Sequence, residues 1–221
     1  MGAVVLLRFC CYSYGDPRDR HSVPARRASD LASGWYYTQV GGGGYPWYSR
    51  LNADPEYVIQ YWDRWFELRK GMLDTNAMMT RINGYNGEIR RAAVRNFNKW
   101  RNLLGNYTWP NAGGWQSRTS HSSEVIWMKD WLTNRLDWID SQHSKPPVYS
   151  LAGGPIAAGM TLGITNSAGG GRIYYTTDGT DPRLRGGSVS PSAQLYSGSI
   201  ILDSAKTIRA RVRTGTTWSP I

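Results

Sequence analysis

The sequence predicts an α + β fold of two domains, in which an amphipathic helical subdomain is followed by a region of β-strands. Between residues 54 and 140, apolar side chains recur at steps of three and four residues, which is the pattern of a helix with one buried face. From Arg172 onward apolar side chains alternate instead, as they do in a strand. Helices that precede strands, and do not alternate with them, indicate separate domains rather than one mixed sheet.

The chain divides into three parts. Residues 1–33 show no sustained period and are expected to be irregular, or to reflect a misplaced start. Residues 34–143 form the helical part, in which residues 34–40 could be a short strand and the glycines 41–44 a linker. No Gly-Lys-Ser/Thr follows these glycines, so a phosphate-binding loop is not expected. Residues 144–221 form the strand-rich part and begin with the linker Ser144–Pro147.

The first helix of the helical part is predicted to begin at Pro55. Asp54 is a good N-cap, proline suits the first helical position, and Gly71 is expected to end the helix. Its apolar stripe consists of Tyr57, Val58, Tyr61, Trp62, Trp65 and Leu68.

Two more helices are predicted to follow. Asp74 or Thr75 caps the second, and the pairs Asn83-Gly84 and Asn86-Gly87 predict a break or kink in its middle. The third is expected to start near residues 122–123.

The strand-rich part opens with the alternating segment Arg172–Thr177. Asp178-Gly179 then predicts a tight hairpin turn, because glycine tolerates positive φ. Asp181-Pro182 ends the strand signal, since proline cannot extend a ladder. The two aspartates could attract a cation, but their ordinary role in turns explains both of them without one.

This cassette resembles a known module. The segments that carry the resemblance are IYYTTDGTDP at 173–182, AQLYSGSIIL at 193–202, KTIRARVR at 206–213 and Trp218-Ser219. Over residues 146–220 they resemble the β-sandwich domain at the C-terminus of chitobiase and β-hexosaminidase. The resemblance implies an immunoglobulin-like antiparallel β-sandwich that serves as an accessory module of secreted proteins. An extracellular or cell-surface location is therefore expected, with the export signal outside this chain.

The helical part resembles a second family. The motifs are DPEY at 54–57, RWFELR at 64–69, RNFNKW at 95–100, YTWP at 107–110 and the segment 124–140. Over residues 34–142 they resemble the C-terminal end of the CotH (spore coat protein H) kinase-like family. The resemblance implies phosphoryl transfer from ATP to protein, with ATP and Mg²⁺ as cofactors of a full-length member.

The catalytic groups of that family are expected upstream of these helices, in a Trp-Asp-x-Asp-type segment followed by Phe-Gly. This sequence has no such segment. Trp62-Asp63-Arg64 is superficially similar, but Asp63 is interpreted as a solvated carboxylate on a helix. No catalytic, cofactor-binding or metal-binding residue is therefore assigned, and the chain is expected to be inactive as written.

Other catalytic constellations find little support. Glu56, Asp63 and Glu67 could pair for glycoside hydrolysis, but acids at helical spacing beside an arginine such as Arg64 are typical of exposed surfaces. The three histidines, His21, His121 and His143, lack metal-ligand spacing. Ser120, His121 and Asp130 have no spacing typical of a catalytic triad.

The composition excludes several other classes of protein. The net charge is +10, with 26 basic and 16 acidic residues, but the basic residues are scattered and nucleic-acid binding is not expected. Cys10 and Cys11 are adjacent, which is poor geometry for a disulfide. The apolar run Ala3–Leu7 is too short for a membrane span or a signal sequence.

The aromatic side chains of the sandwich suggest an alternative function, which is the binding of carbohydrate. Tyr174 and Tyr175 alternate across their strand, so one faces the core and the other solvent. The outward tyrosine, with Tyr196 or Trp218, could stack on a sugar ring. A structural role is the favoured interpretation, in which one aromatic side chain packs in the core and another forms a cross-strand pair.

We therefore predict a non-catalytic C-terminal portion of an extracellular or cell-surface CotH-like kinase, in which the sandwich is a spacer or attachment module. The alternative is a carbohydrate-binding surface module, and a third class is an active kinase with a cryptic site. The expected partners are a protein substrate of the parent kinase or a cell-surface polysaccharide, with no nucleic acid and no membrane span. The irregular first thirty residues and the missing upstream lobe predict that the chain is truncated.

Overall fold

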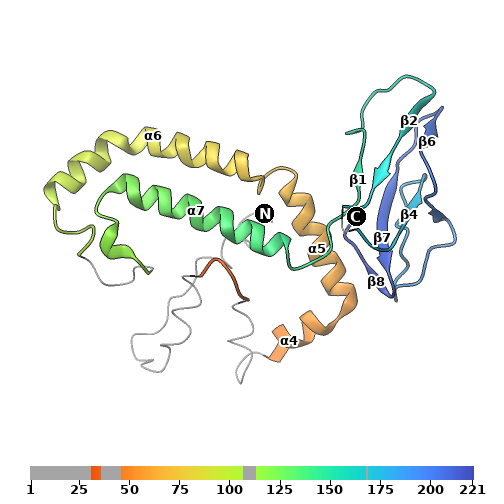
Figure 1. The fold of residues 1–221 in the computed structure, drawn as a ribbon, viewed down its shortest axis with the longest axis horizontal. Helices are drawn as coiled ribbons and strands as arrows, with labels where there is room; N and C mark the ends of the chain where they lie inside the picture. The colour runs from red at the N-terminus through yellow and green to blue at the C-terminus, as the bar shows by residue number, and fades with distance from the viewer. Residues whose placement is uncertain (1–30, 36–45, 107–112, 168) are drawn as a thin grey trace.

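The computed structural model describes residues 31–35, 46–106, 113–167 and 169–221 (Figure 1). The glycine linker 41–44, most of the predicted strand at 34–40, the motif at 107–110, Cys10, Cys11 and His21 lie outside the described residues, as does nearly all of the segment 1–33.

The helical subdomain contains four α-helices and one short 3₁₀ turn within the described ranges. They are α4 (Pro46–Ala53), α5 (Pro55–Arg69), α6 (Thr75–Lys99), η1 (Trp115–Ser117) and α7 (His121–Asp140). Helices α6 and α7 lie side by side as an antiparallel hairpin, and α5 crosses one end of that hairpin (Figure 1). Helix α4 was not predicted from the sequence.

Local capping sets the helix starts. The Asp54 carboxylate accepts the N–H of Glu56 at 2.9 Å, and that of Asp74 accepts the N–H of Ala77 at 2.8 Å, so both predicted caps are confirmed. Helix α7 begins slightly before the predicted start, because Ser120 and Ser123 form a reciprocal capping box.

Helix α6 runs without interruption through both Asn-Gly pairs, so the predicted break is wrong. Gly84 and Gly87 are exposed and meet no neighbouring side chain. The Asn83 side chain accepts a hydrogen bond from Lys129 of α7 at 2.7 Å. The helix therefore tolerates the propensity cost of about 1 kcal/mol per glycine.

The core of the helical subdomain is aromatic. Its buried side chains are Trp62, Trp65, Phe66, Leu136 and Ile139. Trp35 packs edge-on against Trp62 and Trp138, with ring centroids 6.2 and 4.9 Å apart. The predicted stripe of α5 is only partly buried, because Tyr57 and Tyr61 are each 36% exposed.

The C-terminal region is a β-sandwich of antiparallel strand pairs. Its strands are β1 (Val148–Tyr149), β2 (Met160–Leu162), β3 (Ile164–Thr165), β4 (Arg172–Thr176), β5 (Gln194–Leu195), β6 (Ile200–Leu202), β7 (Arg209–Thr214) and β8 (Thr217–Trp218). They form a four-stranded sheet in the order β5-β4-β7-β8 and two strand pairs, β2-β6 and β1-β3. The predicted α + β fold of two domains is confirmed.

The two faces of the four-stranded sheet have different roles. Ile173, Tyr175 and Ala210 face inward, toward the buried Leu162 and Leu202 of the opposing pair β2-β6. The alternate side chains of β4 and β7 face outward, and this outer face lies beside α5 (Figure 1). The helical subdomain therefore covers part of the sheet surface.

The predicted hairpin after β4 is wrong. Gly179 has the expected positive φ of 80°, and the Asp178 carboxylate accepts the N–H of Thr180 at 2.9 Å. The turn opens a long loop, and β5, the next strand along the chain, begins only at Gln194. The Asx turn at Asp178 thus redirects the chain into this loop, and β4 and β5 pair across the long loop rather than across a tight turn.

No helix among the described residues is long and apolar enough to cross a bilayer.

Candidate functional site

The most ordered polar cluster lies between helix α5 and the sandwich, and we call it the docking seam. Its helical half consists of Glu56 and Asp63, which are seven residues apart and therefore lie on the same side of α5, about 10 Å apart along its axis. Ile59, only 8% exposed, lies between them on that side. The opposite side of the helix carries the tryptophans of the helical core.

Asp63 binds Arg211 of β7 through two parallel hydrogen bonds. Arg211 Nη1 donates to Asp63 Oδ1 and Nη2 to Oδ2, both at 2.7 Å. The backbone N–H of Ile221 also donates to Asp63 Oδ1, at 2.9 Å. Planar bidentate pairing of this kind is strong and fixes orientation as well as distance. Asp63 thus joins the helix to two segments of the sandwich.

All five N–H groups of the Arg211 guanidinium are used. Besides the two bonds to Asp63, Nε and Nη2 donate to the two oxygens of Asp181 at 2.7 and 2.6 Å. Nη1 also donates to the backbone carbonyl of Ser219 at 2.9 Å. The side chain is only 2% exposed, and a guanidinium has five donors in total. Its burial therefore leaves no donor unsatisfied.

The charge of this cluster is stable over a wide pH range. Burial acts to lower the pKa of Arg211, but the hydrogen bonds that it donates to Asp181 and Asp63 outweigh burial and raise that pKa above its ordinary value. Burial likewise acts to raise the pKa of Asp181, while Arg211 and the N–H of Arg183 together lower it. Arg211 and Asp181 therefore stay ionised at neutral pH.

Glu56 makes the second contact of the seam. Arg183 Nη1 donates to Glu56 Oε2 at 2.9 Å and Nη2 to Oε1 at 2.6 Å, and the N–H of Gly186 donates to Oε1 at 2.9 Å. The hydrogen bonds from Arg183, and then that from Gly186, lower the pKa of Glu56 from 4.5 to about 2. Both carboxylates of α5 are therefore bound by the sandwich.

The linker is packed along the seam. The ring of His143 lies against that of Trp62, with centroids 5.0 Å apart, and Pro147 is buried. Burial lowers the pKa of His143, so its neutral form is favoured. The chain between the two domains is held against both of them.

These contacts correct the interpretation of two predicted candidates. Asp63 is not a solvated carboxylate, and Glu56 is not a simple surface acid, because each binds a sandwich arginine. Of the three acids, Glu67 is the one at an exposed surface as expected, and it pairs with Arg64 at 2.8 Å. Asp181 has the expected turn role, through the N–H of Arg183, in addition to its ion pair.

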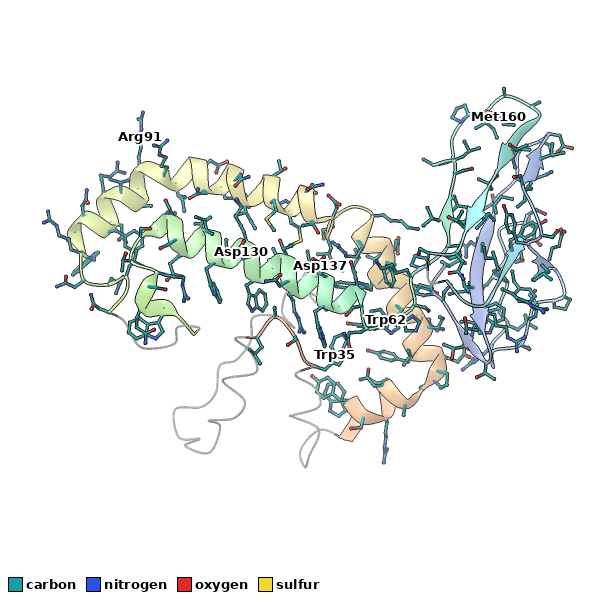
Figure 2. All side chains as sticks on the ribbon, viewed as in Figure 1. Trp35, Trp62, Arg91, Asp130, Asp137 and Met160 are labelled. Carbon is teal, nitrogen blue, oxygen red and sulfur yellow. The ribbon has the colours of Figure 1, made fainter. Side chains whose placement is uncertain are left out.

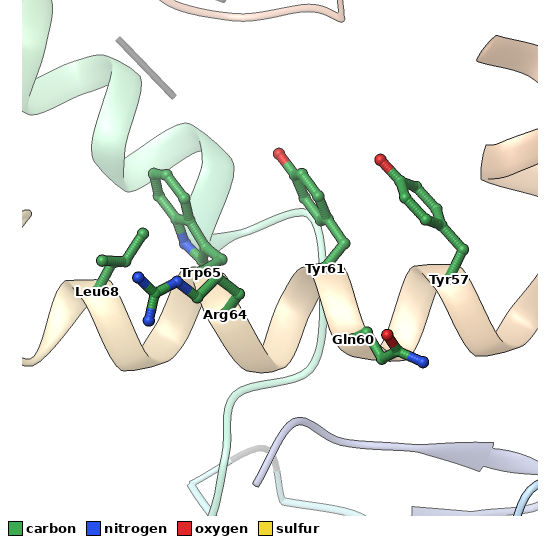
Figure 3. Close-up of a pocket in the computed structure, with 6 residues that line it drawn as sticks. All are labelled: Tyr57, Gln60, Tyr61, Arg64, Trp65 and Leu68. Atoms are coloured by element: carbon green, nitrogen blue, oxygen red, sulfur yellow. The ribbon is translucent and has the colours of Figure 1, made fainter. Parts of the chain in front are cut away.

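A shallow groove of about 220 Å³ lies on another side of α5 (Figure 3). Its lining residues are Tyr57, Gln60, Tyr61, Arg64, Trp65 and Leu68. The rings of Tyr57 and Tyr61 stand in a row, with centroids 6.4 Å apart. Trp65 contributes only an edge, because it is 5% exposed and its Nε1 donates to Asp140 at 2.8 Å. The groove contains no carboxylate, so it offers no acid–base pair.

The other predicted candidates have structural contacts. Ser120 caps α7, and the ring of His121 stacks on Phe97 with centroids 5.7 Å apart. Asp130 lies farther along the same helix, so these three residues do not form a catalytic triad, as expected from their spacing (Figure 2). No group of three His, Cys, Asp or Glu side chains within the described ranges could hold a metal ion.

Of the aromatic candidates in the sandwich, two are structural. Trp218 is 3% exposed and its Nε1 donates to the carbonyl of Gly187 at 2.7 Å. Tyr196 packs against Tyr175, and its hydroxyl accepts the N–H of Ile164 at 3.0 Å. Tyr174 is the one that faces outward and lines a surface hollow.

Comparison with known families agrees with the order of the two domains. The model of the CotH kinase protein family matches residues 18–139, which is more than half of the chain. The chain belongs to the CotH family. The model of the chitobiase/beta-hexosaminidase C-terminal domain matches residues 151–220. Searches of curated proteins and of solved structures find no match.

The Mg²⁺ implied by CotH membership does not fit at Asp63. Asp63 is the nearest counterpart in sequence to a catalytic aspartate, but Arg211 binds both of its oxygens. A metal at Asp63 would have to displace that arginine and leave it buried and partly unpaired, which is costly. The docking seam therefore joins helix α5 to the sandwich.

Proposed function

We propose that the described part of this CotH-family chain is non-catalytic and holds the sandwich in a fixed orientation. In this proposal the sandwich is a spacer or attachment module of a protein that works outside the cell or on its surface. The match to the chitobiase/beta-hexosaminidase C-terminal domain supports an accessory role for the sandwich. The location outside the cell rests on the expected use of such modules in secreted proteins.

The observation that carries the proposal is the pairing of two helical carboxylates with two sandwich arginines. A flexible spacer needs no specific contact with its neighbour, and interfaces between domains usually permit relative motion. Here two bidentate ion pairs, about two helical turns apart, restrain both position and rotation. The packed linker restricts the orientation further.

Calorimetry combined with small-angle X-ray scattering tests the docked arrangement. The unmodified chain is expected to unfold in one cooperative transition, because the two cores are coupled through the seam. Asp63→Asn combined with Glu56→Gln should separate the transitions and increase the radius of gyration. Two independent transitions in the unmodified chain would contradict the proposal.

Mg-ATP tests the non-catalytic assignment. The melting temperature should not change with Mg-ATP, since a ligand that binds only the folded state must stabilise it. A saturable increase would instead support the cryptic kinase. An enzyme known to bind Mg-ATP serves as the positive control.

The carbohydrate-binding alternative is favoured by one observation, which is the outward position of Tyr174 beside a surface hollow. Saturable binding of a polysaccharide that is lost on replacing Tyr174 would support it. Such binding is compatible with the docked arrangement, because an attachment module needs a ligand.

A further inference from the structure

A hollow of about 390 Å³ lies on the outer face of the four-stranded sheet, where β4 begins and β7 turns into β8. Its lining residues are Gly171, Arg172, Tyr174, Arg213, Thr214 and Gly215. None of them belongs to the docking seam. The hollow is lined by two cations, one aromatic ring, one threonine and two glycines.

The two cations of the hollow face each other without an acidic partner. Arg172 and Arg213 are direct cross-strand partners in the antiparallel pair β4-β7. Like charges directly opposite on a sheet are destabilising. Among the described residues, every ion pair of the sandwich and the seam involves other cations, and the seam acids Asp63 and Asp181 are both bound to Arg211. In the part of the chain that the structure describes, the positive charge of the hollow therefore has no acidic partner.

Arg213 also has a buried donor without a partner. Its Nε is inaccessible to solvent and makes no hydrogen bond to any described residue. Buried polar groups in folded proteins are nearly always hydrogen-bonded. The guanidinium carbon lies 5.5 Å from the centre of the Trp218 ring, which holds the side chain in place. An anion in the hollow would neutralise the positive charge of the Arg172–Arg213 pair.

Tyr174 supplies a surface for a ring. Its own ring lies 5.7 Å from that of Trp218, inclined at 57°, so its position is fixed by a buried neighbour. Tyrosine combines an apolar face with a polar hydroxyl, which suits the mixed surface of a sugar. Arginine, in turn, binds planar oxyanions through two parallel N–H groups.

We propose that this hollow binds an acidic sugar residue of a polysaccharide. The sugar ring lies on Tyr174, and its carboxylate or phosphate group accepts hydrogen bonds from Arg172 and Arg213. The inference assigns a ligand class to the attachment module and rests on that proposed role. A carboxylate and a phosphate group can both accept these hydrogen bonds, and the experiment therefore includes one probe with each group.

Titration calorimetry of the whole chain tests the site with three oligosaccharide probes: an oligogalacturonate, a phosphorylated malto-oligosaccharide and a neutral malto-oligosaccharide. One acidic probe, and not the neutral one, is expected to bind. Arg172→Gln should weaken that binding about tenfold, which is the loss of one charge-assisted contact. Tyr174→Leu should weaken it as well, and Arg213→Lys should do so while keeping the charge.

Arg209→Gln is the matched control, because it removes an exposed arginine that lies outside the hollow but on β7, the strand of Arg213. It should change the affinity by roughly twofold or less, because salt screens the attraction between the ligand and a charge outside the hollow. Equal losses in Arg209→Gln and Arg172→Gln would overturn the site and indicate non-specific attraction by a basic protein. Failure of both acidic probes to bind at low salt, or preference for a DNA duplex, would also overturn it.

Scattering curves from the same samples distinguish this inference from the docked arrangement. Loss of binding in Arg172→Gln with an unchanged radius of gyration concerns the hollow alone and supports the assignment. If the oligosaccharide binds equally well to all variants, the hollow is not the site, whereas a fixed orientation of the sandwich would still stand.

Discussion

Replacement of Asp63 by asparagine tests whether the docking seam is one cooperative unit. The Asp63→Asn side chain keeps its shape but turns one acceptor oxygen into an NH₂ group. That group would face the N–H donors of Arg211, so one of the two parallel bonds becomes a donor–donor contact. Arg211 keeps its bonds to Asp181, which limits the loss to the helical side of the cluster.

The expected cost follows from the bonds removed. A hydrogen bond to a charged group contributes about 1.5–3 kcal/mol. Because Asp63 is about one-quarter exposed and Arg211 retains a second carboxylate, we expect the docked state to lose about 2–3 kcal/mol. That loss corresponds to a roughly 30- to 150-fold shift toward the undocked state.

Amide hydrogen exchange measures this shift directly. The N–H of Gly186 donates to Glu56 and not to Asp63, so it reports undocking at a distance from the substituted side chain. Its exchange should accelerate by the same roughly 30- to 150-fold in Asp63→Asn. The N–H of Tyr196, bonded to Ile173 within the sandwich, should keep its rate.

Glu67→Gln is the matched control on the same helix. Its carboxylate is exposed and pairs only with Arg64, so the change in stability should be at most about 0.5 kcal/mol. The cooperative seam would be refuted if Asp63→Asn accelerated exchange at Ile221 but left Gly186 unchanged. The two ion pairs would then open independently of each other.

Three further outcomes are expected. Since the pKa of Glu56 in the folded chain is lowered to about 2, its contribution to docking is fully present above pH 4.5 and is lost as the pH falls toward 2. Hydrogen exchange of the Gly186 N–H, measured against pH, should show this loss, and the Glu56→Gln variant should not show the pH dependence. Asp140→Asn should lower the stability of the helical subdomain by about 2–3 kcal/mol in a denaturant titration, because Asp140 accepts the Trp65 indole N–H and pairs with Arg69. Gly171→Ala should lower the free energy of unfolding by at least about 1–3 kcal/mol, since Gly171 has a φ of +87° and a Cβ there would lie 2.6 Å from the backbone oxygen of Arg213. An unchanged melting temperature would contradict this close approach of Gly171 to Arg213.

The features that the sequence predicts well depend on near neighbours. The caps Asp54 and Asp74 bond to amides two and three residues away, so the local pattern contains all the information needed. Strand β4 and its alternation are confirmed for the same reason. The start of α7 was misplaced because Ser120, Ser122 and Ser123 are all acceptable caps by composition.

The docking seam could not be predicted by the same means, because Arg211 lies 148 residues from Asp63 along the chain. Two signals were nevertheless present. Glu56 and Asp63 share a helix side that the apolar stripe does not occupy. Arg209, Arg211 and Arg213 occupy alternate positions of one strand, so they share one face of the sheet and require acidic partners or solvent.

The roles of the aromatic residues were also determined by long-range packing. Trp218 is a plausible sugar platform by residue type, but its burial depends on the loop at Gly187, which the sequence does not place beside it. Alternation correctly separates Tyr174 from Tyr175, and register then identifies Tyr174 as the outward ring.

The saturation of Arg211 has a consequence for how this module can be recombined with other proteins. A sandwich that is only tethered can be moved to any host by joining the chain at its linker. This sandwich instead contains a buried guanidinium, and the N–H groups that donate to Asp63 would have no acceptor if the sandwich were joined to an unrelated protein. A productive fusion would need a host helix with a glutamate at its start and an aspartate seven residues later, so the two domains are expected to exchange between proteins as a pair.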